Sequence, residues 1–139
     1  RGQADVFTAG DGSYSYRRVS GDPLSIGDDL LGLDASAAWQ RTIDGPYPDA
    51  LVQLAAIAAA PRAGDIIISA AEGWDLRSRW EPLNHVSGHG ALRREQMLVP
   101  FISSRPIGGA LRRSVDVFPT ALKRLGITVP RGLDGSAAS

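Results

Sequence analysis

Both histidines of the chain lie in one short glycine-rich segment, Asn84–Gly90, and four positions separate them. His89 stands between Gly88 and Gly90, where glycine lets the backbone turn sharply and leaves the imidazole uncrowded. A neutral imidazole is a good ligand for zinc. The pattern therefore predicts that His89 presents a ring nitrogen to a metal or a phosphate. The alternative is a polar loop histidine that binds nothing.

His85 is the second candidate, because it precedes His89 by four residues. That spacing would place two metal ligands on one face of a helix. Ser87 and Gly88 disfavour a helix here, so the paired arrangement has little support. We expect either a substrate-binding or supporting role beside the metal ligands, or an ordinary surface histidine.

Three further side chains near this segment could contact a substrate or support the metal ligands. Arg93 and Arg94 could clamp a phosphate, or could form a solvated helical turn with Glu95 as a local partner. Asp75 follows an isoleucine-rich stretch, Ile66–Ile68, and open α/β sheets bind ligands at the carboxyl ends of their strands. The alternative for Asp75 is an aspartate in a turn.

Composition narrows the class of protein. The chain has 139 residues, 43% hydrophobic side chains, no cysteine and a formal net charge of zero. This is the size of one ordinary domain, and thiolate metal sites and disulfides are excluded. Residues 1–70 hold 5 basic and 9 acidic side chains, whereas residues 71–139 hold 10 and 6. The positive excess suits an anionic ligand but is too diffuse to indicate nucleic acid.

No stretch approaches the roughly 18 apolar residues of a membrane span, so we expect a soluble protein whose compartment the sequence leaves open. Because the chain begins at Arg1 and shows no signal-peptide pattern, we expect it to be part of a longer polypeptide or a processed product.

The N-terminal part predicts a β-hairpin. Strand-like segments at 6–10 and 14–19 flank the turn Gly10–Ser13. Residues 25–45 are ambiguous, although 36–43 could form a short helix.

Further along the chain, helices and apolar strands alternate. A helix is predicted over 48–60, with Leu51, Leu54, Ile57 and Ala58 on one face. Residues 65–70 and 98–103 predict strands buried on both faces, as in a parallel sheet. A second helix is predicted over 114–125, with Gly126 as its C-cap. Its apolar side is expected to hold Val115, Phe118, Leu122 and Leu125. The fold class is therefore α/β, with a partial, mostly parallel sheet, flanking helices and an N-terminal hairpin.

Three motifs occur in an order typical of one enzyme superfamily. They are Ser87–Gly90, the apolar stretch Met97–Phe101, and Val115–Ile127, which reads VDVFPTALKRLGI. In this order they resemble the C-terminal part of the alkaline phosphatase-like superfamily, and its type I phosphodiesterase/nucleotide pyrophosphatase branch most of all. The helix–strand pair that begins at Pro48–Ala50 also resembles that branch. The resemblance covers about residues 46–135.

This resemblance implies hydrolysis of phosphoric esters at two divalent metal ions, with zinc expected and manganese as the alternative. His89 matches the last histidine ligand of the family. The nucleophile and the other ligands precede this region in the family, and no counterpart occurs here. The resemblance thus implies a C-terminal portion of a hydrolase that is inactive alone, with a phosphate ester or nucleotide-like molecule as the substrate of the parent.

The expected organisation is a hairpin and linking region at 1–45, a segment of the hydrolase core at 46–129 and a flexible tail at 130–139. No nucleic-acid partner is expected. A partial sheet would expose an edge, so the chain could form homo-oligomers or serve as a non-catalytic, ligand-binding module.

Overall fold

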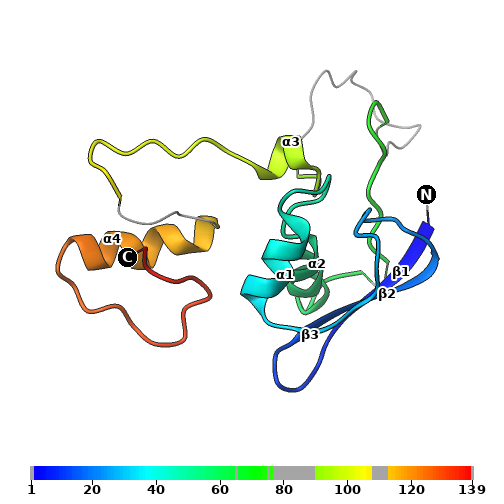
Figure 1. Cartoon of the computed structure of the whole chain (residues 1–139), viewed down its shortest axis with the longest axis horizontal. Helices are drawn as coiled ribbons and strands as arrows, with labels where there is room; N and C mark the ends of the chain where they lie inside the picture. Colours follow the sequence, from blue (N-terminus) through cyan, green and yellow to red (C-terminus); the bar gives the residue numbers. More distant parts are fainter. Residues whose placement is uncertain (1, 65, 75, 77–89, 108–112, 139) are drawn as a thin grey trace. The chain divides into compact units, whose positions relative to one another are not determined.

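The computed structural model describes residues 2–64, 66–74, 76, 90–107 and 113–138. The chain divides into two compact units, Arg1–Val99 and Pro100–Ser139. Figure 1 shows the elements of the first unit, labelled β1 to α3, and the helix α4 of the second. None of the helices in the described ranges has the length and apolar composition needed to cross a bilayer.

The sheet of the first unit has three antiparallel strands in the order β1-β2-β3. These strands are β1 (Gly2–Thr8), β2 (Tyr14–Gly21) and β3 (Leu30–Leu33). The α/β class and the N-terminal hairpin are therefore confirmed. The expected mostly parallel sheet is wrong, because consecutive strands joined by short connections pair antiparallel.

The hairpin turn forms where its composition predicts. Gly12 has a φ of 80°, in the left-handed region that glycine adopts without steric cost. The Asp11 carboxylate accepts a hydrogen bond of 2.9 Å from the Ser13 N–H, and the Ala9 N–H donates one of 3.0 Å to the Ser13 carbonyl. The turn thereby fixes which residues of β1 and β2 face each other, with Val6 opposite Tyr16.

The core of the first unit lies between this sheet and two helices. Tyr16 of β2 is fully buried and is the largest side chain at the centre. Helix α2 contacts β1 and β2, and helix α1 packs against α2 and β3. The buried residues of the cluster are Tyr16, Leu30, Ala38, Leu51 and Val52.

Helix α1 (Ala35–Thr42) lies where the short helix was predicted. Asp34 is its N-cap, and its carboxylate accepts a hydrogen bond of 2.8 Å from the Ala37 N–H. At the other end, Thr42 Oγ1 donates to the Ala38 carbonyl at 2.9 Å and accepts from the Asp49 N–H at 3.0 Å. Thr42 thus links the end of α1 to the start of the next helix.

Helix α2 (Ala50–Ala58) is shorter than the predicted 48–60. Asp49 has a φ of 59°, so the backbone is left-handed there and the helix begins one residue later. Leu51 is buried, but Ile57 and Ala58 at the far end are exposed. Only the first turns of α2 therefore bury the predicted apolar face.

The predicted strands at 65–70 and 98–103 do not belong to the described sheet. Ile66 and Ile68 are 79% and 68% exposed, and Ile102 is 90% exposed. An extended segment becomes a strand only where a neighbour completes its hydrogen-bond ladder, and the sheet is built from the first 33 residues. The expectation of two buried strands is wrong for this reason.

The second unit is built around the predicted C-terminal helix. A 3-10 turn, η1 (Ser114–Asp116), leads into α4 (Val117–Arg124). Gly126, with a φ of 70°, ends the helix as predicted, and the Ile127 N–H donates to the Leu122 carbonyl at 2.9 Å.

The helix α4 does not bury the face that periodicity predicts. Pro119 and Thr120 are buried, whereas Phe118 and Leu125 are exposed. The reason is the C-terminal segment, which binds the Thr120 side through a 2.9 Å hydrogen bond from the Ala138 N–H to Thr120 Oγ1. The C-terminal segment therefore determines which side of α4 is buried, and the periodicity of the helix sequence alone does not include this segment.

Candidate functional site

The residues directly after His89 fix how the chain leaves this histidine. Gly90 has a φ of 93°, a conformation that side-chain-bearing residues rarely adopt. The Ala91 N–H then donates a 2.8 Å hydrogen bond to Oε1 of Gln96. This hydrogen bond fastens the start of the described segment to the helix that follows.

The predicted ligand His89 and the three residues His85, Gly88 and Asp75 lie outside the described residues. Their predicted metal-binding, supporting and substrate-binding roles therefore stay predictions. The described neighbours on the C-terminal side show how the segment is attached to the first unit.

Arg94 anchors this segment to the connection between α1 and α2. Its backbone N–H donates to the Pro46 carbonyl at 2.8 Å, and its guanidinium donates to the Ile43 carbonyl. Arg94 begins helix α3 (Arg94–Met97) and is partly buried. Two hydrogen bonds from one residue hold the start of α3 against a segment about 50 positions earlier in the chain.

Arg93 is held by acidic side chains. Its Nη2 lies 3.1 Å from Glu72 Oε2, and its Nε lies 3.4 Å from Glu95 Oε2. These contacts match the alternative prediction for Arg93, a helical turn in which Glu95 is its local partner. A phosphate would have to compete with two carboxylates for the Arg93 guanidinium, so the predicted phosphate contact of Arg93 and Arg94 stays a prediction.

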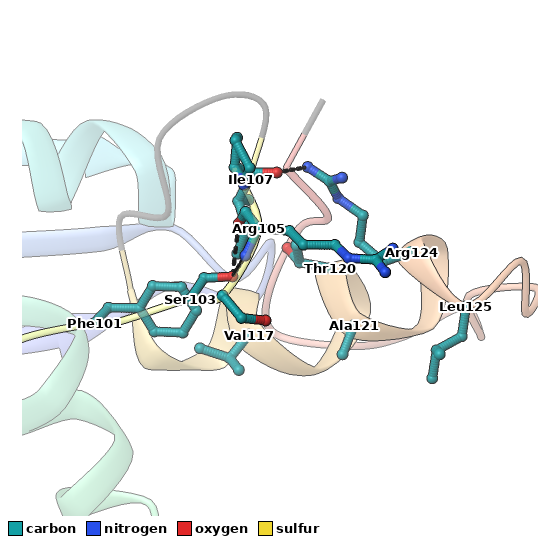
Figure 2. Close-up of a pocket in the computed structure, with 11 residues that line it drawn as sticks. Phe101, Ser103, Arg105, Ile107, Val117, Thr120, Ala121, Arg124 and Leu125 are labelled. Atoms are coloured by element: carbon teal, nitrogen blue, oxygen red, sulfur yellow. Dashed lines mark hydrogen bonds between the residues drawn. The ribbon is translucent and has the colours of Figure 1, made fainter.

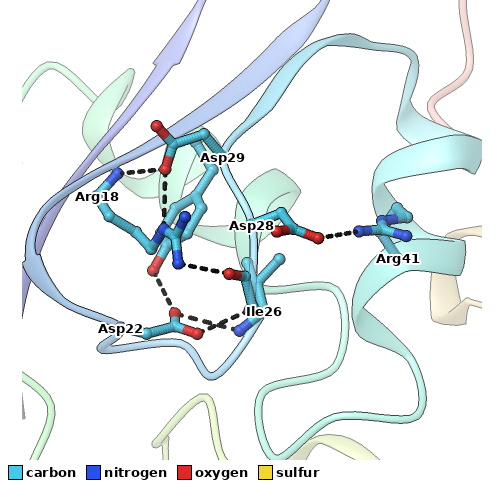
Figure 3. A network of polar contacts seen from close by, with 8 residues as sticks. Arg18, Asp22, Ile26, Asp28, Asp29 and Arg41 are labelled. Carbon is cyan, nitrogen blue, oxygen red and sulfur yellow. Dashed lines mark hydrogen bonds and ion pairs between the residues drawn. The ribbon is translucent and has the colours of Figure 1, made fainter.

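A polar network that the sequence analysis did not single out follows β2 (Figure 3). The Asp22 carboxylate accepts hydrogen bonds from the Tyr16 hydroxyl at 2.8 Å, from the Gly27 N–H at 2.7 Å and from the Ile26 N–H at 3.2 Å. Partial burial raises the pKa of Asp22, but the bonds from Gly27, Tyr16 and Ile26 outweigh it and leave the pKa below its ordinary value. This carboxylate therefore stays ionised and closes the loop.

Arg18 extends the same network. Its backbone N–H and its Nε both donate to Asp29 Oδ1, at 3.0 and 2.9 Å, and its guanidinium also donates to the Gly27 carbonyl. The bonds from Arg18 hold the pKa of Asp29 below its usual value. Asp28 and Arg41 form a looser, exposed pair at 3.9 Å. These carboxylates face arginines and backbone N–H groups, so the network stabilises a loop.

The described residues do not bring three or more histidines and carboxylates together into a group that could hold a metal ion. The signal for the network was available in the sequence, as acidic residues beside glycines at Gly21–Asp22 and Gly27–Asp29, but it reads there only as turn chemistry. No protein-family model matches the chain, and neither a curated protein nor a solved structure matches it.

Proposed function

We propose that the chain is the C-terminal portion of a metal-dependent phosphoric ester hydrolase of the alkaline phosphatase-like kind. In this proposal His89 supplies one ligand of a two-metal site in the parent protein. The 139 residues do not hydrolyse phosphoric esters by themselves. Phosphodiesters and nucleotide-like pyrophosphates are the proposed substrates of the parent.

The order of three motifs carries this proposal: Ser87–Gly90, then Met97–Phe101, then Val115–Ile127. Local structure is compatible with two of them. Gly90 adopts the left-handed conformation that a glycine-flanked histidine turn requires, and Gly126 ends the helix of the third motif. Each of these is a local property, so it supports the motifs and leaves the parent fold as part of the proposal.

The number of metal ligands in this chain limits the catalysis that it can perform by itself. An open catalytic zinc site needs three protein ligands, and the resemblance assigns only one of them, His89, to this chain. When bound in the parent, the metal ions would polarise the phosphoryl oxygens and stabilise the leaving oxygen. The role of this chain is to position one imidazole, through the turn at Gly90 and the anchor of Arg94 on Ile43 and Pro46.

The proposed inactivity of the isolated chain has a direct test. The 139-residue protein is incubated with bis(4-nitrophenyl) phosphate and zinc or manganese, and release of nitrophenolate is followed. We expect no release above that of the metal in buffer. Turnover comparable to that of a complete hydrolase would overturn the view that the chain lacks most of its site.

The metal-ligand role of His89 is tested in the parent polypeptide. We expect His89→Ala to lower both the bound metal, measured by elemental analysis, and the hydrolysis rate. His85→Ala removes an imidazole four residues away: it should leave the metal content unchanged if His85 is a surface histidine, and should lower it less than His89→Ala does if His85 supports the ligands. A parent that keeps all its metal after His89→Ala would remove His89 from the site.

A second candidate function is a self-associating, non-catalytic module. The observation that favours it is the exposure of large aliphatic side chains in 66–68 and 98–102, of which Ile102 is 90% exposed. Sedimentation velocity over a wide concentration range distinguishes the two. A monomer at all concentrations would contradict self-association, and Ile102→Glu should dissolve any dimer that this segment mediates.

A further inference from the structure

The second unit contains a pocket of about 470 Å³. Figure 2 shows that the segment Phe101–Ile107 forms one wall and that one side of α4 forms the other. Val117, Thr120, Ala121 and Arg124 line the α4 side, and residues three or four positions apart share one face of a helix. The volume falls within the range of about 300–1,000 Å³ that small-molecule sites occupy.

The charged lining of this pocket is cationic. Arg105 and Arg124 contribute guanidinium groups, and none of the lining residues that the structure describes is acidic. Arg124 Nη2 donates to the Pro106 carbonyl at 2.7 Å, which ties the guanidinium to the opposite wall and leaves most of its donors unused. Arg105 forms no ion pair with a residue that the structure describes. Residues 100–139 hold six basic and two acidic side chains, so no local excess of carboxylates neutralises the pair.

The remaining walls are mainly apolar and hold two hydroxyl groups in defined positions. Phe101, Val117 and Leu125 line the pocket and are exposed to solvent. Ser103 Oγ donates to the Arg105 carbonyl at 2.7 Å and thereby fixes the turn that carries Arg105. Thr120 Oγ1 accepts from the Ala138 N–H at 2.9 Å, so its own hydroxyl hydrogen remains available as a donor.

We infer that this pocket binds a small organic anion, with a carboxylate or phosphate group held by Arg105 and Arg124 and a flat apolar body held against Phe101 and Val117. Guanidinium groups pair with planar or tetrahedral oxyanions through charge-assisted hydrogen bonds, and the apolar walls gain from burial of a ring. The site uses neither histidine and lies within residues 100–139. The inference is therefore independent of the proposed hydrolase function.

The binding test uses the 139-residue chain and isothermal titration calorimetry. The probes are 2-naphthyl phosphate and 2-naphthoate, and the comparators are inorganic phosphate and 2-naphthol, which each carry one half of the proposed ligand. We expect at least one probe to bind about tenfold more tightly than either inorganic phosphate or 2-naphthol. A charge-assisted hydrogen bond contributes on the order of 1.4 kcal/mol, and that free energy corresponds to a tenfold change in the dissociation constant. The tighter probe identifies the head group as phosphate or carboxylate.

Three variants distinguish this pocket from general surface charge. Arg105→Gln should weaken binding about tenfold, since its guanidinium contacts the ligand and makes no described ion pair. Arg131→Gln removes the same charge from an exposed position of the same unit outside the pocket and should leave the affinity unchanged. Ala121→Leu keeps both arginines but fills part of the pocket, and it should abolish binding of the naphthyl probes.

The folded state of each variant is checked by circular dichroism and thermal unfolding before titration. The inference is overturned if neither probe saturates the wild-type chain. It is also overturned if Arg131→Gln weakens binding as much as Arg105→Gln, or if folded Ala121→Leu binds as the wild type does.

Discussion

The Tyr16 hydroxyl donates a 2.8 Å hydrogen bond to Oδ1 of Asp22, which joins the buried start of β2 to the loop that follows this strand. The Tyr16 ring is fully buried in the core, so the hydroxyl bonds the loop directly to a core side chain. The same carboxylate accepts the N–H groups of Ile26 and Gly27. The packing of the core and the shape of the loop therefore depend on one carboxylate.

Removal of the Tyr16 hydroxyl should destabilise the first unit. We expect Tyr16→Phe to lower the free energy of unfolding by about 1 kcal/mol, the typical net value of one intramolecular hydrogen bond. Tyr14→Phe is the matched control, because Tyr14 lies on the same strand without a described hydroxyl bond, and it should change stability by less than about 0.5 kcal/mol. Chemical denaturation measures both. Equal effects of the two substitutions would contradict a role for the Tyr16–Asp22 bond.

Alkaline pH should reveal the same contact. Burial, with a contribution from the hydrogen bond to Asp22, raises the pKa of Tyr16 to about 12. Below about pH 10 both the folded and unfolded chains hold the proton, so the stabilisation is complete. Between about 10 and 12 the unfolded chain ionises first, so the free energy of unfolding falls as the pH rises. Absorbance at 295 nm should show a tyrosine component that titrates near pH 12, and Tyr16→Phe should remove that component.

At acidic pH the carboxylates of the network should have the opposite effect. Hydrogen bonds from Arg18 lower the pKa of Asp29 below its unfolded value. Its contribution is therefore present above about pH 4 and is lost as the pH falls through the folded pKa. We expect Asp29→Asn to flatten the acid side of the curve of unfolding free energy against pH. Asp28→Asn removes only an exposed ion pair of 3.9 Å, so it should lower the free energy of unfolding at pH 7 by less than about 1 kcal/mol.

The two adjacent arginines at the start of α3, Arg93 just before it and Arg94 as its first residue, should differ in their effect on stability. Arg94→Gln removes a partly buried bond from a guanidinium to the Ile43 carbonyl, and we expect a loss of about 1–2 kcal/mol. Arg93→Gln breaks ion pairs whose glutamates are mostly exposed, so its cost should stay below about 1 kcal/mol. Thermal unfolding compares the two variants. A larger loss for Arg93→Gln would show that Arg94 is not the anchor.

Gly135 should be intolerant of any side chain. A Cβ at this position would overlap the Val115 carbonyl group and lie 2.8 Å from the Asp116 backbone nitrogen. We expect Gly135→Ala to displace the C-terminal segment at a cost of about 1–3 kcal/mol, as overpacking does. Hydrogen exchange at the Ser136 and Ala138 amides, which bond to Asp116 Oδ1 and Thr120 Oγ1, should accelerate.

Gly10→Ala is the control for this substitution, because Gly10 also has an ordinary φ and nothing lies within 4 Å of the added Cβ. Unchanged exchange at both C-terminal amides in Gly135→Ala would show that the segment does not need this close approach.

Local signals were sufficient for several elements of the fold. The turn at Gly10–Ser13, the short helix α1 and the end of α4 at Gly126 each depend on residues within one or two turns of the chain. The left-handed φ at Gly90 is of the same kind. Such features follow from backbone sterics and capping, which are properties of neighbouring residues.

Local signals in the sequence could not predict which segments pair as strands or which residues pack against each helix. The apolar stretch around Ile66–Ile68 has the composition of a buried strand, yet its burial depends on a neighbour elsewhere in the chain. The start of α2 was misplaced because Asp49 takes a left-handed conformation within a contact to the end of α1. Both errors concern interactions between residues far from the immediate sequence neighbourhood.

The candidate functional residues divide in the same way. The sequence alone determined that His89 is flanked by glycines, that the three motifs occur in order, and that turns and helix ends lie where glycine and proline allow them. Only the tertiary structure decided that Arg94 anchors α3 on Ile43 and that Arg105 and Arg124 line one pocket. The physical reason is that conformation at a single residue is set by local sterics, whereas contacts between distant residues depend on how the whole chain folds.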